Sequence, residues 1–237
     1  KQIKIDKAEI IYVSDERVSN ISGTQFYPAI FKASNIAFGE PVAFQYKSFD
    51  VAPQVAQILE RKPDVVALAP DSAGKVIKEL RRQGFQGRVI GSQIFADPNA
   101  LDLFGRDADG LLIVAGYWSD RNDLTRSFTK KFADENAKRG LTTKKIPHHT
   151  DAQAYDIVYL LKQAMEKAGV TGDPAKLAAE RTAIRDAMKG IRFTGVTGDA
   201  TCFNAARDAQ LPGFVIEIKD LKWNLFDQHA ADPRPQG

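Results

Sequence analysis

The chain is short of several features, and each shortage excludes a class of protein. One cysteine, Cys202, stands among its 237 residues, so an intrachain disulfide is impossible. No apolar run reaches the roughly 18 residues that a membrane-spanning helix requires. The 33 lysines and arginines are interspersed with 30 acidic residues, which leaves a net charge of +3. Nucleic-acid binding needs a clustered basic face, so no nucleic-acid partner is expected.

No signal peptide opens the sequence given. The chain begins with KQIKIDKAEIIYV and passes almost directly into an apolar segment. So abrupt a start predicts that an upstream segment has been lost.

The motifs of nucleotide-binding and hydrolytic enzymes are also missing. After Val13 the chain reads SDERVSNISG, in which Gly23 is the only glycine, so a dinucleotide cradle is not expected. Neither a phosphate-binding loop nor a GxSxG nucleophile elbow occurs. The adjacent His148 and His149 lack a second Cys/His pair, and neighbours in a loop should point apart, so we interpret them as solvated or hinge-lining. No metal and no cofactor is expected.

The remaining catalytic candidates are generic. Ser14, Asp15 and His149 can be assembled on paper into a Ser/His/Asp set, but any chain of this length offers one. Asp15, Asp71 and Asp97 each follow an expected strand, where capping of a helix is the first interpretation and ligand contact the second. The sequence therefore favours a binding protein over an enzyme.

What is present is an alternation of short apolar runs with helix-compatible segments over the first 115 residues. The runs are Ala8–Val13, Pro41–Gln45, Asp64–Ala69, Arg88–Gly91 and Gly110–Ala115. Such alternation predicts an α/β fold with a doubly wound parallel sheet and helices on both faces. In these sheets ligands bind beyond the carboxyl ends of the strands.

Apolar residues at helical spacing locate the helices between and after these strands. The expected helices are Ser19–Asn35 with a kink or late start at Pro28, one beginning near Asp50, Ser72–Gln83, Pro98–Phe104, Leu124–Arg139, Asp151–Ala168 and Ala175–Lys189. The last three follow one another with no strand between them. Something must therefore cover their apolar faces, such as the stripe from Tyr155 to Met165.

The C-terminal part returns to strands. Ala200–Phe203 reads as a short strand that buries Cys202 as an inert thiol. Gly213–Lys219 and Lys222–Phe226 are expected to pair through the two-residue turn Asp220-Leu221. The Pro-rich tail is predicted to be disordered.

Three pieces of the chain together resemble a known family. They are AEIIYVSDERVS, then VAQILERKPDVVALAPDSAGKVIKELRRQGFQGRVIGSQ, then the pair AYDIVYLLKQAMEKAG and FTGVTGDATCFNAARDAQLPGFVIEIKDLKW. In order and spacing they resemble the type I periplasmic solute-binding proteins of ABC importers, in the branched-chain amino-acid (Leu/Ile/Val-binding) group. The likeness spans nearly the whole chain, although no single motif is diagnostic.

The resemblance implies a periplasmic-binding-protein-like I fold with two α/β lobes. Residues 1–116 would form the C-terminal-type ligand-binding lobe, 117–198 the helical remainder of the N-terminal-type lobe, 199–228 the return to the first lobe, and 229–237 a disordered tail. The first half of the N-terminal lobe has no counterpart, so the sequence is either a fragment or one of two chains.

The resemblance also implies a function. Such a protein captures a small organic ligand, an amino acid or an aromatic carboxylate, between lobes that close like a Venus flytrap, and delivers it to an ABC permease in the membrane. It would be periplasmic, or extracellular and tethered to the membrane, and either monomeric or associated with a missing N-terminal fragment. The alternatives are an α/β hydrolytic enzyme and a ligand-sensing regulatory or receptor domain of the same fold.

Family contacts with the ligand come from the loops after strands one, three and four, here Ser14–Ser19, Pro70–Ala73 and Ser92–Phe95. With the hinge included, the expected ligand-binding residues are Ser14, Arg17, Val18, Ser19, Asp71, Ser72, Gln93, Phe95 and Tyr117. Amino-acid-binding relatives often place an aromatic residue where Val18 or Ser19 stands, and a glutamate that faces the ligand ammonium where Gln93 stands.

These departures bear on the ligand. A neutral amide at Gln93 cannot offset the cost of burying an ammonium group, so a plain α-amino acid is disfavoured. Phe95, Tyr117 and Trp118 either flank a flat apolar ring or pack between the lobes. Arg17 either pairs with an anionic group or lies solvated at the surface. A small aromatic carboxylate fits these residues.

Overall fold

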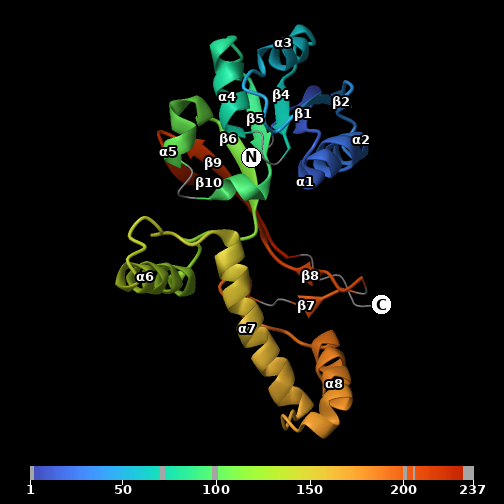
Figure 1. The fold of residues 1–237 in the computed structure, drawn as a ribbon, viewed down its shortest axis with the longest axis vertical. Coiled ribbons are helices and arrows are strands. Elements are labelled where there is room, and N and C mark those ends of the chain that lie inside the picture. The colour runs from blue at the N-terminus through green and yellow to red at the C-terminus, as the bar shows by residue number, and fades with distance from the viewer. Residues whose placement is uncertain (1–2, 70–72, 98–100, 200–201, 205, 232–237) are drawn as a thin grey trace. The chain divides into compact units, whose positions relative to one another are not determined.

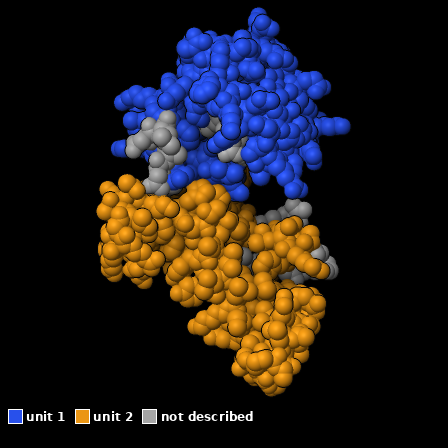
Figure 2. All heavy atoms as spheres, viewed as in Figure 1, with its two compact units in different colours: residues 1–114, 215–227 blue, residues 115–214, 228–237 orange. Residues whose placement is uncertain are grey.

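A computed structural model describes residues 3–69, 73–97, 101–199, 202–204 and 206–231. The chain divides into two compact units (Figure 2). Unit 1 comprises residues 1–114 and 215–227, and unit 2 comprises residues 115–214 and 228–237. Residues 199–214 thus group with unit 2, whereas the family resemblance places them in the return to the first lobe.

Unit 1 is built on a sheet of eight strands among its described residues (Figure 1). The strands are β1 Lys7–Val13, β2 Ala37–Phe38, β3 Val42–Phe44, β4 Val65–Leu68, β5 Arg88–Gly91, β6 Leu111–Ala115, β9 Gly213–Lys219 and β10 Lys222–His229. The order is β10-β9-β6-β5-β4-β1-β2, with β3 also paired to β1. Every pairing among β1 to β6 that the structure describes is parallel, as the alternating pattern predicts.

Helices connect these strands. They are α1 Arg17–Ile21, α2 Tyr27–Ala33, α3 Ala52–Glu60, α4 Ala73–Arg82 and α5 Leu101–Phe104. A π-helical turn over Ser22–Phe26 joins α1 to α2, and Pro28 occupies the first turn of α2. The helical run therefore begins at Arg17, two residues before its expected start, so a late start at Pro28 is wrong. Gly84 follows α4 with a φ of +87°. Glycine permits this left-handed conformation, which terminates the helix.

The core of unit 1 lies on both faces of the sheet. All four residues of β4 are buried, and so are five of the seven residues of β1, as in parallel strands covered on two sides. Ala8 and Ile10 pack with Phe31 of α2 on one face. Side chains alternate along a strand, so Ile11 turns to the opposite face.

The hairpin between β9 and β10 closes one edge of this sheet. Two residues, Asp220 and Leu221, connect the strands, as the sequence predicts, and their φ angles are +51° and +57°. Positive φ at both central residues is the signature of a type I′ turn, which matches the twist of paired strands. β10 extends to His229, so the expected disordered tail overlaps the strand at that residue, while residues 232–237 lie outside the described part.

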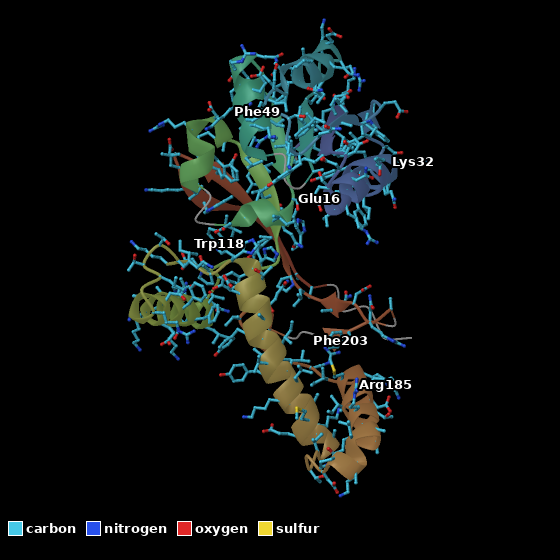
Figure 3. The ribbon with its side chains drawn as sticks, in the orientation of Figure 1. Glu16, Lys32, Phe49, Trp118, Arg185 and Phe203 are labelled. Atoms are coloured by element: carbon cyan, nitrogen blue, oxygen red, sulfur yellow. The ribbon has the colours of Figure 1, made fainter. Side chains whose placement is uncertain are left out.

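Unit 2 is mainly helical. It contains α6 Asp123–Lys138, α7 His149–Ala168, α8 Leu177–Lys189 and the short strands β7 Cys202–Phe203 and β8 Ala209–Gln210. α8 runs back alongside α7 (Figure 1). Leu160 and Ala164 of α7 pack with Ile191 and with residues of α8. Phe203 packs against the same cluster (Figure 3), whereas the expected burial of Cys202 concerns a side chain outside the described set.

α7 begins two residues before its expected start. Asp151 does cap the helix, but as the third residue of a capping box, in which its carboxylate accepts a hydrogen bond from the backbone N–H of His148 at 2.9 Å. No helix among the described residues is both long and apolar enough to cross a membrane.

Candidate functional site

The parallel strands of unit 1 bring several loops to one edge of the sheet. Ile11, Leu68, Gly91 and Ile113 stand in register across four neighbouring strands. The segments that follow β1, β4 and β5 therefore leave the sheet at its carboxyl edge, where ligands of such folds bind. These segments carry most of the residues that the sequence nominates.

The loop after β1 is fixed by hydrogen bonds. The backbone N–H and the hydroxyl of Ser14 both donate to the carbonyl of Phe44, at 2.8 and 3.2 Å. The Asp15 carboxylate accepts from the backbone N–H of Tyr46 at 2.7 Å. Glu16 caps α1 by accepting from the backbone N–H of Ser19 at 2.6 Å (Figure 3). The expectation that Asp15 caps this helix is therefore wrong, because its carboxylate joins β1 to the end of β3.

Three predicted site residues on α1 differ in exposure. Ser19 is fully buried, and its hydroxyl oxygen accepts a hydrogen bond from the backbone N–H of Val13 at 2.9 Å. Arg17 and Val18 are exposed. Ser19 thus anchors the first turn of α1 against β1, and Arg17 and Val18 present their side chains to solvent.

Two residues that the sequence analysis did not single out support the same edge. The Lys75 ammonium donates to the carbonyls of Tyr46 and Ser48, at 2.9 and 2.8 Å, and lies 5.3 Å from the ring centre of Phe44. The Tyr27 hydroxyl donates to the carbonyl of Leu68 at 3.1 Å, and burial raises the pKa of this phenol. Tyr27 and Lys75 each lie in the first turn of a helix. That position was the sequence signal that could have identified them.

The loop after β5 turns one side chain outward and one inward. Gln93 is exposed, whereas Phe95 lies in the interior of unit 1, with its ring edge-on to Phe104 at 6.4 Å between centres. A Cβ on Gly91 would come within 2.6 Å of the Phe95 ring, so only glycine leaves room for this packing. Phe95 contributes to the core beneath the loop.

Tyr117 lies in unit 2 and is buried there. Its hydroxyl shares a hydrogen bond of 3.0 Å with the Thr129 hydroxyl, and its ring stands edge-on to Phe128. Burial raises the pKa of this phenol to about 12, so it is neutral at physiological pH. Ala152 and Val196 complete the cluster, which accounts for the burial of Tyr117 within its own unit.

The structure therefore brings Ser14, Arg17, Val18 and Gln93 to the carboxyl edge of unit 1 as exposed side chains. Asp71 and Ser72, also predicted for the site, lie outside the described residues. The exposed members supply one cation, one hydroxyl, one amide and one apolar group. Arg17 is the charged member of these four side chains, so the set suits non-covalent binding of a small organic anion.

The adjacent histidines differ from expectation. The rings of His148 and His149 lie 3.9 Å apart between centres, so the expectation that they point apart is wrong. His149 is buried, and loss of hydration, followed by the influence of His148, lowers its pKa to about 4. No group of three potential metal ligands occurs among the described residues.

Comparison with known proteins decides the family. A family model described as periplasmic binding protein matches residues 4–222, which is nearly the whole chain. The chain belongs to this family. The proteins that it resembles are solute-binding proteins and not enzymes. No curated protein matches it.

Solved structures share the fold. The leucine-binding protein LivK of Thermotoga maritima is 17% identical with a TM-score of 0.78, over 97% of this chain and 61% of its own. A solute-binding protein of a Rhodopseudomonas palustris ABC transporter, in complex with benzoate, is 20% identical with a TM-score of 0.76, over 96% and 59%. Another, from R. palustris BisB5 with 3,4-dihydroxybenzoic acid, is 20% identical with a TM-score of 0.72, over 98% and 62%.

These likenesses establish a periplasmic-binding-protein-like I fold. The chain spans about three fifths of the length of the solved structures that it matches.

Proposed function

We propose that this chain is the solute-binding component of an ABC importer, periplasmic or held outside the cell membrane, and that it captures a small organic solute for a membrane permease. The match to periplasmic binding proteins over residues 4–222 carries this proposal. The carboxyl edge of unit 1 supplies the surface, because its loop after β1 is held rigid by the hydrogen bonds of Ser14, Asp15 and Glu16. A preorganised loop loses little freedom when a ligand binds.

An aromatic carboxylate is the ligand that this edge supports best. Arg17 is exposed and has no hydrogen-bond or ion-pair partner among the described residues, so its guanidinium is available for a bidentate pair with a carboxylate. Val18, Tyr46 and Ile94 expose apolar surface in the same loops, with 47 to 55% of each residue accessible. Apolar groups of this kind suit a flat hydrophobic ring.

The neutral side chain of Gln93 argues against an ammonium-bearing ligand. The carboxylates of Asp15 and Glu16 already accept backbone N–H groups, and Gln93 is uncharged. An ammonium group buried beside Gln93 would find no counter-charge on that side chain, which is costly. Two of the solved relatives hold benzoate-type acids, which supports the same class, whereas the leucine-binding relative supports an amino acid.

A thermal-shift panel on the full chain tests the proposal. It contains benzoate, 4-hydroxybenzoate, 3,4-dihydroxybenzoate, cyclohexanecarboxylate, leucine and phenylalanine. A ligand at 100 times its Kd stabilises the native state by about 2.7 kcal/mol, which raises Tm by roughly 5–10 °C in a protein of this size. We expect the benzoates to produce this rise and leucine to leave Tm unchanged. A rise with leucine alone refutes the aromatic ligand, and no rise with any compound refutes solute capture.

The Arg17→Gln variant locates the anion. It should weaken benzoate binding at least tenfold by calorimetry and leave the Tm of the free protein within about 1 °C, because the side chain is exposed. Arg106→Gln is the matched control. Arg106 is exposed on the same unit but precedes β6, at the amino edge of the sheet. Equal losses in both variants would mean that only net charge matters.

A further inference from the structure

The loop after β3, residues 45–49, also lies at the carboxyl edge of unit 1. β3 pairs in parallel with β1, and the last residues of the two strands, Phe44 and Val13, stand in register. The two loops therefore leave the sheet side by side. The family resemblance places ligand contacts in the loops after β1, β4 and β5, so the loop after β3 has no role in that scheme.

Charged side chains from two other segments hold the backbone of Tyr46 on both sides. Its N–H donates to the Asp15 carboxylate at 2.7 Å, and its carbonyl accepts from the Lys75 ammonium at 2.9 Å. The same ammonium donates to the carbonyl of Ser48 at 2.8 Å, and the Ser48 N–H donates to the carbonyl of Gln45 at 2.9 Å. Hydrogen bonds with a charged partner are stronger than neutral ones, so these contacts fix the point from which the Tyr46 side chain projects.

The side chain of Tyr46, unlike its backbone, is open to solvent, with 55% of the residue exposed. A tyrosine on a fixed backbone has only two side-chain angles left to order, so it can bind a flat partner at a small cost in entropy. Asp15, which accepts the Tyr46 N–H, lies two residues before Arg17. The Tyr46 ring and the Arg17 guanidinium thus project from segments that are hydrogen-bonded to each other. The ring suits the aromatic part of an acid, and the guanidinium suits its carboxylate.

Lys75 joins this loop to a third segment of the edge. It belongs to the first turn of α4, the helix that follows the loop after β4, and its ammonium lies 5.3 Å from the ring centre of Phe44 at the end of β3. A cation at this distance is attracted to an aromatic ring. One side chain therefore ties the end of β3 and the loop after it to α4, within unit 1.

We propose that Tyr46 is a specificity-determining residue, which selects aromatic over aliphatic acids by contact with the ligand ring, and that Lys75 is the positioning residue that holds it in place. This inference rests on the proposed function, because it assigns roles within the same site. Arg17 binds the carboxylate that aromatic and aliphatic acids share. Tyr46 contacts the flat ring that only the aromatic acids possess.

Calorimetry with benzoate and cyclohexanecarboxylate on the full chain tests the role of Tyr46. We define the aromatic preference as the Kd of cyclohexanecarboxylate divided by the Kd of benzoate. Tyr46→Leu should lower this preference about three- to tenfold, because leucine keeps an apolar contact but has no ring face. Phe49→Leu is the matched control, since Phe49 is a fully exposed aromatic residue of the same loop (Figure 3), and the preference should stay within about twofold. An unchanged preference in Tyr46→Leu, or equal losses in both variants, overturns the proposal.

Three lysine variants test the positioning role. Lys75→Met removes both hydrogen bonds and should lower the aromatic preference as much as Tyr46→Leu does. Combining the two substitutions should lower it little further, because both remove the same contact. Lys75→Arg keeps a cationic donor and should restore most of the preference. Lys78→Met, which removes an exposed lysine one turn further along α4, should leave it unchanged. Fully additive losses in the double variant contradict a role through Tyr46.

Limited trypsin digestion reports on Lys75 without any ligand. Lys47 is exposed and lies between the two residues whose carbonyls Lys75 holds. Lys75→Met should be cleaved after Lys47 roughly tenfold faster than the wild type, because its loop opens more often, and Lys78→Met should be cleaved at the wild-type rate. Equal rates in the wild type and Lys75→Met refute the positioning role.

The two readouts separate failure of this inference from failure of the proposed function. If the wild type binds neither acid, the proposed function fails and the role of Tyr46 fails with it. If the wild type prefers benzoate, and Lys75→Met is cleaved faster but keeps the wild-type aromatic preference, the proposed function stands and Lys75 only stabilises the loop. That result overturns the inference.

Discussion

Asp156 of α7 binds a turn of unit 2 through its side chain. Its buried carboxylate accepts three hydrogen bonds, from the backbone N–H groups of Val196 and Thr197 at 3.0 and 2.7 Å and from the Thr197 hydroxyl at 2.6 Å. Gly195 passes so close that a Cβ there would lie 2.4 Å from both carboxylate oxygens. One side chain thus fixes the turn over residues 195–198 to α7.

The Asp156→Asn variant should lose about 2–3 kcal/mol of unfolding free energy. The amide oxygen is a weaker acceptor than the carboxylate, and the amide NH₂ group would face the backbone N–H groups that now donate to Asp156. Gly195→Ala should cost as much through steric overlap. Urea unfolding measures both. Asp120→Asn, which alters an exposed acid paired with Arg126, should leave the midpoint unchanged. A loss in this control equal to that of Asp156→Asn would contradict the assignment.

His149 makes the stability of unit 2 dependent on pH. Burial and then the neighbouring His148 lower its pKa from 6.5 to about 4, so the native state keeps the imidazole neutral at pH values where the unfolded chain is protonated. Between pH 6.5 and 4 the unfolded state binds more protons, so stability falls as pH falls through this window.

The free energy of unfolding should therefore drop by roughly 2 kcal/mol at most between pH 7 and pH 5 because of this one group. Urea titrations at the two pH values measure the drop, and the His149→Gln variant should lose most of it. An unchanged pH slope in that variant would show that other groups set the dependence.

Only part of the candidate site was predictable from the sequence. The position of a loop after a strand places Ser14, Arg17 and Gln93 at the carboxyl edge, because all parallel strands end there. Whether a loop residue turns in or out depends on packing that sequence spacing does not specify. Ser19, Phe95 and Tyr117 were nominated with the others, and the structure buries each of them within its own unit.

At the scale of elements, the strands that are covered on both faces were the predictable ones. β1, β4, β5 and β6 lie within one or two residues of their expected bounds, since a doubly covered strand must be continuously apolar. The pairs of residues that form β2 and β8 carry no detectable pattern, whereas β7 lies within the strand expected at Ala200–Phe203. The start of α7 was missed because its capping box uses His148, a residue type outside the usual N-caps.

The β9–β10 turn offers a stabilising substitution. Leu221 holds φ of +57°, a conformation that costs a β-carbon-bearing residue roughly 1–2 kcal/mol. Leu221→Gly should therefore raise the unfolding free energy by about 0.5–1 kcal/mol and Tm by roughly 2–4 °C. Leu225→Gly, at a similarly exposed position within β10, should lower Tm instead. A fall in Tm for both variants would show that the Leu221 side chain contributes more than its backbone strain costs.

At the scale of the whole molecule, apolar burial and not surface charge holds the chain together. The largest fully buried side chains are almost all apolar, from Ile10 to Ile218. Many of the ion pairs among the described residues join exposed partners one helical turn apart, such as Lys130–Asp134 and Arg139–Glu135. An exception is Glu9 with Arg61 at 2.6 Å, whose carboxylate is fully shielded from solvent.

Stability should consequently respond weakly to salt. Ions screen exposed pairs, and such pairs add little to stability even at low ionic strength, whereas the buried Glu9–Arg61 pair is screened much less. We expect Tm to move by no more than about 2 °C between 50 and 500 mM sodium chloride in scanning calorimetry. Arg61→Ala, which leaves Glu9 buried without its partner, should cost about 3–5 kcal/mol at either salt concentration. If added salt lowers Tm by 5 °C or more and Arg61→Ala leaves the free energy of unfolding unchanged, then the surface ion pairs stabilise the fold and this prediction is wrong.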